Sequence, residues 1–252
     1  MPITIAISGK GGTGKTTLAA LVIRCLTDQG HTVLAVDADP NTNLNELLGL
    51  EVEETIGQTR EETRAGIADI PAGMTKERFI DLRLQQCLVE SRGLDLLAMG
   101  YQEGPGCYCY INTLLRGFLD RLSKNYDYVV VDNEAGMEHL SRRTTQNVDL
   151  LLIVSDTTPA ALRAAQRIKA IADSLGLQIA RIGLVLNRAD SSQMDASLTG
   201  GLELLASLPQ DELLTRLSLD SKPIAQLPED SPALNAVSAM LAKLRITANP
   251  SA

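Results

Sequence analysis

The sequence predicts an α/β domain with a mostly parallel, twisted sheet that is flanked by helices on both faces. Short apolar runs rich in β-branched residues alternate with longer segments of helical periodicity, an order typical of parallel strands joined by right-handed crossovers. Leu, Ala, Ile and Val dominate the composition and tryptophan is absent, as expected for a parallel sheet buried on both faces. The 252 residues suffice for one large core and contain no internal repeat, so we expect a single domain over residues 1–252.

Each predicted element rests on a local pattern. The predicted strands are the apolar runs at residues 3–8, 32–36, 94–99, 126–131, 149–154 and 181–186. The predicted helices cover residues 15–29, 76–90, 159–175 and 231–245, and one more helix follows Gly106 and ends near Leu122. Gly30 stops the first helix, and Ser231 caps the last one with Pro232 at its first position. Residues 51–77 are polar without a core periodicity, so we expect a surface excursion there.

Composition also limits the function. Lys and Arg number 23 against 31 Asp and Glu, and such an acidic chain repels phosphate backbones and anionic lipids, so we expect neither a nucleic-acid nor a membrane partner. No apolar stretch approaches the roughly 20 residues of a membrane span. The chain enters its first strand without a leader pattern, and four cysteines do not make a disulfide scaffold. We therefore expect a cytoplasmic protein.

The strongest motif is a phosphate-binding loop between the first strand and the first helix. Residues 9–16 fit the pattern G-x-x-x-x-G-K-[ST], which defines a P-loop NTPase. Glycines let backbone N–H groups surround phosphate oxygens, while Lys15 reaches the terminal phosphates and Thr16 binds Mg²⁺. The alternative, a merely flexible glycine-rich turn, does not account for the strand and helix on either side. The predicted nucleotide ligands here are Gly11, Gly12, Thr13, Gly14, Lys15, Thr16 and Thr17.

Lys10, directly after the first glycine of the loop, carries further information. A second lysine at this point resembles the deviant Walker A group, which includes nitrogenase iron protein, MinD, ParA and the arsenite-pump ATPases. The resemblance implies that Lys10 reaches across a dimer interface to the nucleotide of the partner, as an arginine finger does. The alternative is a solvated surface lysine.

Three carboxylates follow predicted strands. Asp37 and Asp39 end the second strand, and Asp132 directly follows the apolar run at residues 128–131. Ligands of open α/β sheets bind beyond the carboxyl ends of strands, so Asp132 is placed to hold Mg²⁺ through its water shell. Asp39 resembles the switch I aspartate that positions the attacking water, and the segment from Asp132 to Gly136 resembles switch II, in which the N–H of Gly136 approaches the γ-phosphate. The alternative is ordinary turn chemistry, which also favours Asp.

The sequence indicates the bound nucleotide base less clearly than it indicates the phosphate site. Asn187, Arg188 and Asp190 partly match the guanine-binding pattern N-K-x-D, whereas deviant-lysine ATPases keep the Asn with a basic neighbour. The resemblance also implies that a later loop with Pro209 and Asp211 lines the base pocket. We expect ATP, with GTP as the alternative.

Cys107 and Cys109 form a candidate soft-metal half-site at the start of a predicted helix. A helix N-terminus lowers the thiol pKa, and a two-fold dimer would supply the two further sulfurs of a four-thiolate site. The alternatives are two small core residues or a surface redox pair. Cys25 and Cys87 lie among apolar residues and are expected in the core, and His139 is expected on a helix surface.

The segment around these cysteines is similar to the CooC/AcsF family of nickel-insertion ATPases. The matching residues are Gly104, Pro105, Gly106, Cys107, Tyr108, Cys109, Asn112 and 114–116, together with the switch II segment 132–140. The resemblance implies a homodimer that binds Ni²⁺ at its interface and couples ATP hydrolysis to nickel delivery, with carbon monoxide dehydrogenase or acetyl-CoA synthase as client. Zn²⁺ also binds thiolates well and is a second occupant of such a site. Three alternatives stay open: a MinD/ParA-like positioning ATPase, an iron–sulfur carrier, and a nickel GTPase.

Overall fold

The described chain contains one eight-stranded sheet. In this computed structural model the described residues are 1–65, 70–100, 109–134, 147–174, 176–189 and 199–244. The strand order is β3-β4-β2-β5-β1-β6-β7-β8, and every neighbouring pair is parallel except β3 with β4. The predicted class, a mostly parallel α/β sheet, is therefore confirmed.

The strands place the carboxyl ends of β1, β2 and β5 side by side at one edge of the sheet. Their bounds are β1 Ile3–Gly9, β2 Val33–Asp37, β3 Leu88–Ser91, β4 Leu94–Ala98, β5 Tyr128–Asp132, β6 Asn147–Ser155, β7 Gln178–Asn187 and β8 Glu203–Leu208. Asp132 is in register with both Ile7 of β1 and Asp37 of β2. The register thus brings two of the predicted carboxylates together next to the loop that follows β1.

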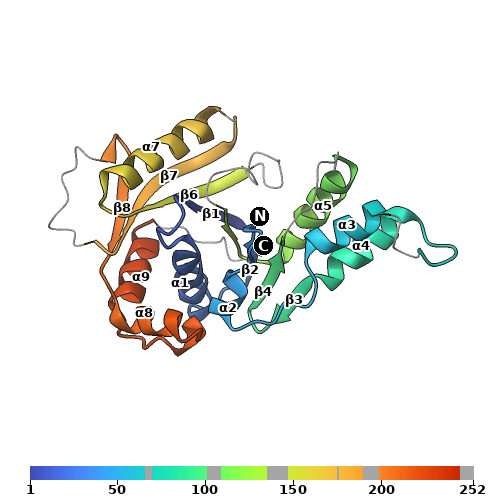
Figure 1. The fold of residues 1–252 in the computed structure, drawn as a ribbon, viewed down its shortest axis with the longest axis horizontal. Coiled ribbons are helices and arrows are strands. Elements are labelled where there is room, and N and C mark those ends of the chain that lie inside the picture. Colours follow the sequence, from blue (N-terminus) through green and yellow to red (C-terminus); the bar gives the residue numbers. More distant parts are fainter. Residues whose placement is uncertain (66–69, 101–108, 135–146, 175, 190–198, 245–252) are drawn as a thin grey trace.

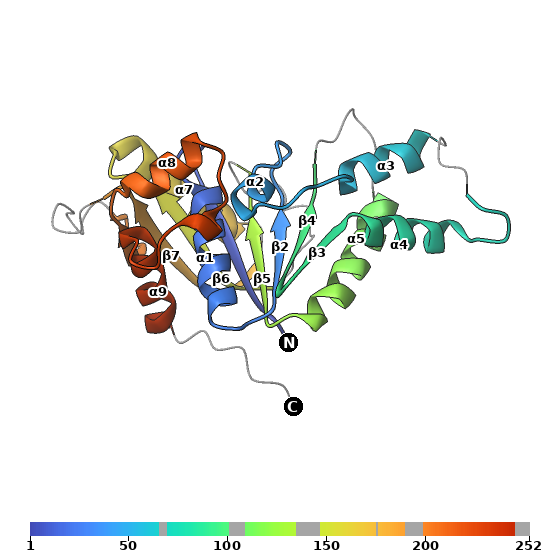
Figure 2. The ribbon, with the colours of Figure 1, turned by 90° about the horizontal axis from the view of Figure 1, so that it is seen from below.

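Helices cover both faces of the sheet (Figure 1, Figure 2). Their bounds are α1 Lys15–Asp28, α2 Leu44–Leu48, α3 Ile56–Ala65, α4 Lys76–Gln86, α5 Cys109–Leu122, α7 Pro159–Ser174, α8 Glu212–Leu219 and α9 Pro232–Leu244. Helices α1 and α9 pack on one face, while α5 and α7 pack on the other. In Figure 2, α3 and α4 extend from the β3 end of the sheet, away from α8 and α9.

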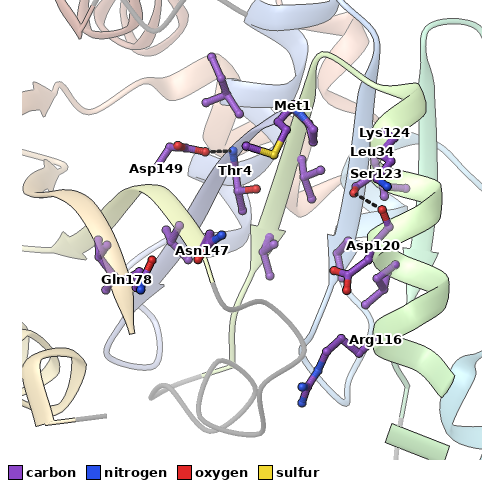
Figure 3. Close-up of a pocket in the computed structure, with 18 of the residues that line it drawn as sticks. Met1, Thr4, Leu34, Arg116, Asp120, Ser123, Lys124, Asn147, Asp149 and Gln178 are labelled. Carbon is purple, nitrogen blue, oxygen red and sulfur yellow. Dashed lines mark hydrogen bonds between the residues drawn. The ribbon is translucent and has the colours of Figure 1, made fainter. Parts of the chain in front are cut away.

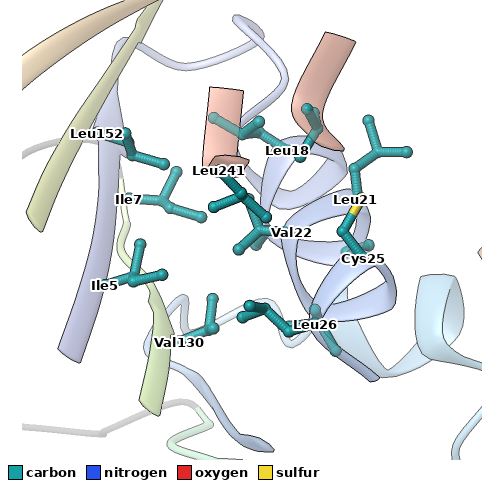
Figure 4. Packing of buried hydrophobic residues seen from close by; sticks show 14 of the residues in the cluster. Ile5, Ile7, Leu18, Leu21, Val22, Cys25, Leu26, Val130, Leu152 and Leu241 are labelled. Atoms are coloured by element: carbon teal, nitrogen blue, oxygen red, sulfur yellow. The ribbon is translucent and has the colours of Figure 1, made fainter. Parts of the chain in front are cut away.

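The core shows why β1 and α1 form where they do. Successive side chains of a strand point to opposite faces, so Ile5 and Ile7 pack toward α1 while Ala6 packs toward α7. In Figure 4, Ile7 faces Val22 of α1 and Leu241 of α9. These residues are fully or almost fully buried, and this packing fixes the start of α1 against the end of β1.

Two predictions for residues 51–90 are wrong. Residues 51–77 are not a surface excursion throughout, because α3 buries Ile56, and Gly57 donates a backbone hydrogen bond to the carbonyl of Met99. The helix predicted at 76–90 ends at Gln86, and Leu88–Ser91 forms the edge strand β3. A tight turn with Gly93 at φ +75° returns the chain into β4, and this antiparallel pairing outweighs the helical pattern.

The other predicted elements are confirmed within a few residues, and β8, α2 and α8 were not predicted. Gly30 follows α1 with φ +85°, and the Ser231 hydroxyl accepts a hydrogen bond from Leu234 N at 3.2 Å as the cap of α9. Across the residues described above, no helix has both the length and the apolar character that a membrane span requires.

Candidate functional site

The phosphate-binding loop connects β1 to α1 as predicted. Gly14 caps α1 with φ +92° and contributes no side-chain bond to the helix end, so the N–H groups of the first turn remain available to a ligand. The loop is held in shape by Thr13, whose hydroxyl donates to the carbonyl of Lys10 at 2.7 Å. This geometry is a ready cradle for an anion.

The two lysines of the loop differ in their surroundings. Lys15 is 8% exposed, and its charge lies close enough to Asp132 to lower the pKa of that carboxyl. Lys10 is exposed at the loop surface. Lys15 is therefore placed inside its own chain's site, whereas Lys10 has an orientation that leaves it accessible to another molecule.

Asp132 is a buried acid beside the loop. It is 1% exposed, it hydrogen-bonds to Thr16, and its Oδ1 has no hydrogen-bond partner. Burial raises the pKa of Asp132 to about 7; Thr16 and Lys15 oppose the shift, and Asp37 and Asp39 add to it. A buried carboxylate oxygen without a partner, next to a threonine hydroxyl, fits the oxygen ligands that Mg²⁺ takes. The Mg²⁺ ligation itself remains a prediction.

Asp37 shapes the segment that follows β2. It is fully buried, and its two oxygens accept hydrogen bonds from Asp39 N at 3.0 Å and Leu44 N at 2.9 Å. Burial raises the pKa of Asp37 to about 6. Because both oxygens hold backbone N–H groups, Asp37 fixes the turn and the start of α2.

Asp39, the predicted switch I residue, is half-buried beside this turn. Its Oδ1 accepts from both Asn41 N and Asn41 Nδ2, each at 2.9 Å, and its charge acts on Asp132. The structure thus brings Asp39, Asp37 and Asp132 together at the ends of adjacent strands. The second oxygen of Asp39 remains available to a water molecule or a ligand.

Asn187, one of the predicted base-binding residues, contacts the phosphate loop. Asn187 donates from Nδ2 to the carbonyl of Thr13 at 2.8 Å, and its Oδ1 accepts from Arg188 N. Arg188 is exposed and has φ +55°, a left-handed conformation that its neighbour's side chain stabilises. Asp211 is 7% exposed and caps α8, and Pro209 lies two residues before it in the same loop.

One buried residue of the site was missed in the sequence. Asn133 follows Asp132 and is 1% exposed; its backbone N and its Nδ2 both donate to the carbonyl of Ile7, at 3.0 and 2.9 Å. It ties the end of β5 to β1. The available signal was a polar side chain directly after a buried strand.

Several predicted site residues lie outside the described part of the chain. These are Gly136, His139, Asp190, Cys107 and the side chain of Cys109, whose backbone begins α5. Cys25 and Cys87 are buried core residues as predicted, and burial raises the pKa of both thiols. Among the described residues no group of three or more His, Cys, Asp or Glu is arranged to hold a metal ion.

A cavity of about 870 Å³ lies on the sheet face that α5 and α7 share (Figure 3). It is lined by residues at the starts of strands, such as Asn147 and Gln178, and by Arg116 of α5. Thr4 N donates to Asp149 at its edge, at 2.7 Å. Of the residues predicted for the nucleotide site, none that the structure describes lines this cavity, so the described site at the carboxyl ends of the strands is a separate feature.

The chain matches a known family of nucleotide-binding domains over most of its length. Residues 4–225 match the model described as the CobQ/CobB/MinD/ParA nucleotide binding domain. An uncharacterised ATP-binding protein of Methanocaldococcus jannaschii is 42% identical over 233 residues, covering 90% of this chain and 92% of that protein.

Two further comparisons are informative. The carbon monoxide dehydrogenase accessory protein CooC of Rhodospirillum rubrum is 34% identical over 233 residues, covering 83% of this chain and 84% of that protein. One chain of the MinC:MinD cell division protein complex of Aquifex aeolicus superposes with a TM-score of 0.73 at 23% identity, covering 99% of this chain and 98% of that one. The latter likeness concerns the fold alone.

Proposed function

Because the chain belongs to the CobQ/CobB/MinD/ParA family of nucleotide-binding domains, we propose that it is an ATP-hydrolysing metallochaperone. In this proposal a homodimer binds nickel and delivers it to carbon monoxide dehydrogenase or acetyl-CoA synthase. The observation that carries the proposal is the 34% identity to a carbon monoxide dehydrogenase accessory protein over most of both chains.

The nucleotide half of the proposal uses the described site. Backbone N–H groups of the loop and Lys15 bind the phosphates, and Thr16 and Asp132 would hold Mg²⁺. The ion, when bound, neutralises charge on the phosphate oxygens. Asp39 orients the attacking water, whose oxygen bonds to the γ-phosphorus as the bond to the bridging oxygen breaks. ADP leaves with that oxygen, and the water keeps one hydrogen in the phosphate and loses its other proton to solvent. Lys10 of the partner subunit stabilises the charge that develops.

The metal half rests on Cys107 and Cys109. Two thiolates from one short segment leave a d-block ion half-coordinated, and a two-fold axis supplies the same two ligands again. Nickel is the proposed cargo, and the expected stoichiometry is half a metal ion per chain. Four thiolates around Ni²⁺ allow a square-planar arrangement, whereas Zn²⁺ takes a tetrahedral one, so the absorption spectrum distinguishes the occupants.

A MinD-like positioning switch is the second candidate. It is supported by 26% identity to the septum site-determining protein MinD of Synechocystis over 231 residues. This candidate requires no thiolate-bound metal, and its ATP-bound dimer would act on a cell-division partner. An iron–sulfur carrier, the third candidate, would be brown after anaerobic purification with visible absorbance.

Metal stoichiometry with and without nucleotide tests the proposal. The chain is loaded with NiCl₂ and desalted. Elemental mass spectrometry then gives the nickel content per chain, and light scattering gives the molar mass of the assembly. We expect half a nickel per chain, bound tightly by a dimer, and loss of that nickel in Cys107→Ser and in Cys109→Ser. Cys87→Ser is the matched control, because this thiol is 1% exposed and contacts Thr59 in the core.

The outcomes separate the candidates. One tightly bound nickel per chain that survives Cys107→Ser would overturn the shared site. No metal binding combined with ATP-dependent dimerisation would favour the positioning switch, and tighter binding of GTP than of ATP would favour a nickel GTPase.

A further inference from the structure

Both oxygens of the Asp211 carboxylate are fully engaged within the protein. Oδ1 accepts from the backbone N of Leu213 at 3.0 Å and of Leu214 at 3.1 Å, in the first turn of α8. Oδ2 accepts from the Ser231 hydroxyl at 2.6 Å and from Ala233 N at 3.4 Å, at the start of α9. A carboxylate offers about four lone-pair sites, and four donors occupy them here.

Ser231 extends this arrangement into α9. Its hydroxyl donates to Asp211 and accepts from Leu234 N at 3.2 Å, so it caps α9 while it binds the cap of α8. Ser231 is 1% exposed and Asp211 is 7% exposed. One carboxylate therefore fixes the N-termini of two helices that lie 20 residues apart in the sequence.

The position of this double cap is what makes it relevant to the nucleotide. The carbonyl of Leu208, at the end of β8, accepts from Ala189 N at 2.9 Å. Two residues before Ala189, Asn187 donates to the carbonyl of Thr13 in the phosphate loop. Residues 209 and 210 are thus held on one side by the strand ends beside the phosphate loop and on the other by Asp211.

We propose that Asp211 is a positioning residue of the nucleotide site: it sets the backbone of Pro209 and Gln210 beside the base and does not itself accept a hydrogen bond from the base. This inference rests on the proposed nucleotide-binding function. If a base amino group donated a hydrogen bond to an Asp211 oxygen, it would displace a helix N–H or the buried Ser231 hydroxyl and leave that donor without a partner. Base selection then falls to Asn187 and to backbone groups of the 209–210 segment.

The two roles predict different effects on selectivity. A carboxylate that accepts from the adenine amino group favours ATP over GTP, so its loss would lower ATP affinity and leave GTP affinity unchanged or improved. A positioning carboxylate affects both nucleotides equally, because it acts on the shape of the segment that both bases contact. Loss of the Ser231 hydroxyl, which is buried between the two helix ends and cannot contact the base, should then have the same effect on both nucleotides.

Binding of N-methylanthraniloyl-labelled ATP and GTP to the full chain and to four variants tests this. Ser231→Ala and Asp211→Asn should weaken both nucleotides by a common factor of about five, the factor that corresponds to one lost buried hydrogen bond of about 1 kcal/mol, with the ATP to GTP ratio unchanged within twofold. Ser231→Thr, which keeps the hydroxyl, should recover affinity. Ser174→Ala is the control, since this serine is exposed at the end of α7.

Either of two results would overturn the inference. One is an ATP to GTP ratio that falls tenfold in Asp211→Asn; the other is unchanged affinity for both nucleotides in Ser231→Ala. Thermal melting of each variant without nucleotide identifies any that fail to fold, and the ratio in Asp211→Asn then decides alone. Failure of the wild-type chain to bind either nucleotide would overturn the proposed function, and the inference with it.

Discussion

The side-chain amide of Asn187 lies 2.8 Å from the carbonyl oxygen of Thr13, so the end of β7 is bonded to the phosphate loop across 174 residues of sequence. Gly14, the next residue of the loop, passes directly beneath this amide. A Cβ at position 14 would lie 2.2 Å from Asn187 Nδ2, and the backbone there has φ +92°. The left-handed backbone favours glycine at this position, and a larger residue would also displace the Asn187 amide from its hydrogen bond.

Gly14→Ala should therefore destabilise the chain and abolish nucleotide binding. A left-handed conformation costs a residue with a Cβ on the order of 1–3 kcal/mol, and the contact with Asn187 adds to that cost. Chemical unfolding without nucleotide measures the loss of stability, and labelled ATP measures the loss of binding. Gly11→Ala is the control for stability, because its Cβ would meet no atom within 4 Å. Equal stability of the two variants would contradict the steric argument.

Lys10→Ala should leave nucleotide binding largely intact and remove most ATP hydrolysis. The lysine is exposed at the surface of its own chain's loop, and the proposal has it act on the phosphates of the partner subunit. Mixing Lys10→Ala chains with Asp39→Ala chains should restore part of the activity, because one of the two composite sites in a mixed dimer retains both residues. Phosphate release at a fixed total chain concentration is the measurement. Normal hydrolysis by Lys10→Ala alone would contradict the assignment.

Local patterns in the sequence were sufficient for most of the fold and the phosphate loop. The loop is predictable because its chemistry depends on a short contiguous stretch between a strand and a helix. The acids at residues 37 and 132 are predictable as a pair because parallel strands end at the same edge of the sheet.

The remaining features depend on contacts that no local pattern contains. Strand β3 forms because the turn at Gly93 pairs it with β4, against a helical periodicity. Asp211 accepts a hydrogen bond from Ser231, which is distant in sequence. Asn133 ties β5 to β1 by donating to the carbonyl of Ile7, which is also distant in sequence. Asp37 was predicted as a carboxylate at the end of a strand, but its burial and its two backbone partners become visible only in three dimensions.

Cys25 and Cys87 should resist alkylation in the folded chain. Burial, with a smaller contribution from Asp28, raises the pKa of Cys25 to about 11, so about one thiol in a thousand is ionised at pH 8. Burial also raises the pKa of Cys87. Iodoacetamide at pH 8, followed by peptide mass spectrometry, should label both at least about a hundredfold more slowly than in urea. Rapid labelling of either residue in the folded chain would contradict its place in the core and its use as a control.

Asp132→Asn should make the metal-free chain more stable than the wild type at pH 8, with a smaller difference at pH 5. Burial raises the pKa of Asp132 to about 7, so the folded state favours the protonated carboxyl more than the unfolded state does. A raised pKa contributes stability that is fully present below the unfolded pKa near 3.8 and is lost as the pH rises through 7. Between pH 5 and pH 8 the wild type should lose on the order of 2 kcal/mol of folding stability through this group, whereas an amide loses nothing.

Urea unfolding of both chains in EDTA at the two pH values measures the difference. Asp37, with a pKa raised to about 6, is present in both chains and does not account for it. A gap between the two chains that stays constant from pH 5 to pH 8 would show that Asp132 is already ionised in the folded protein at pH 5.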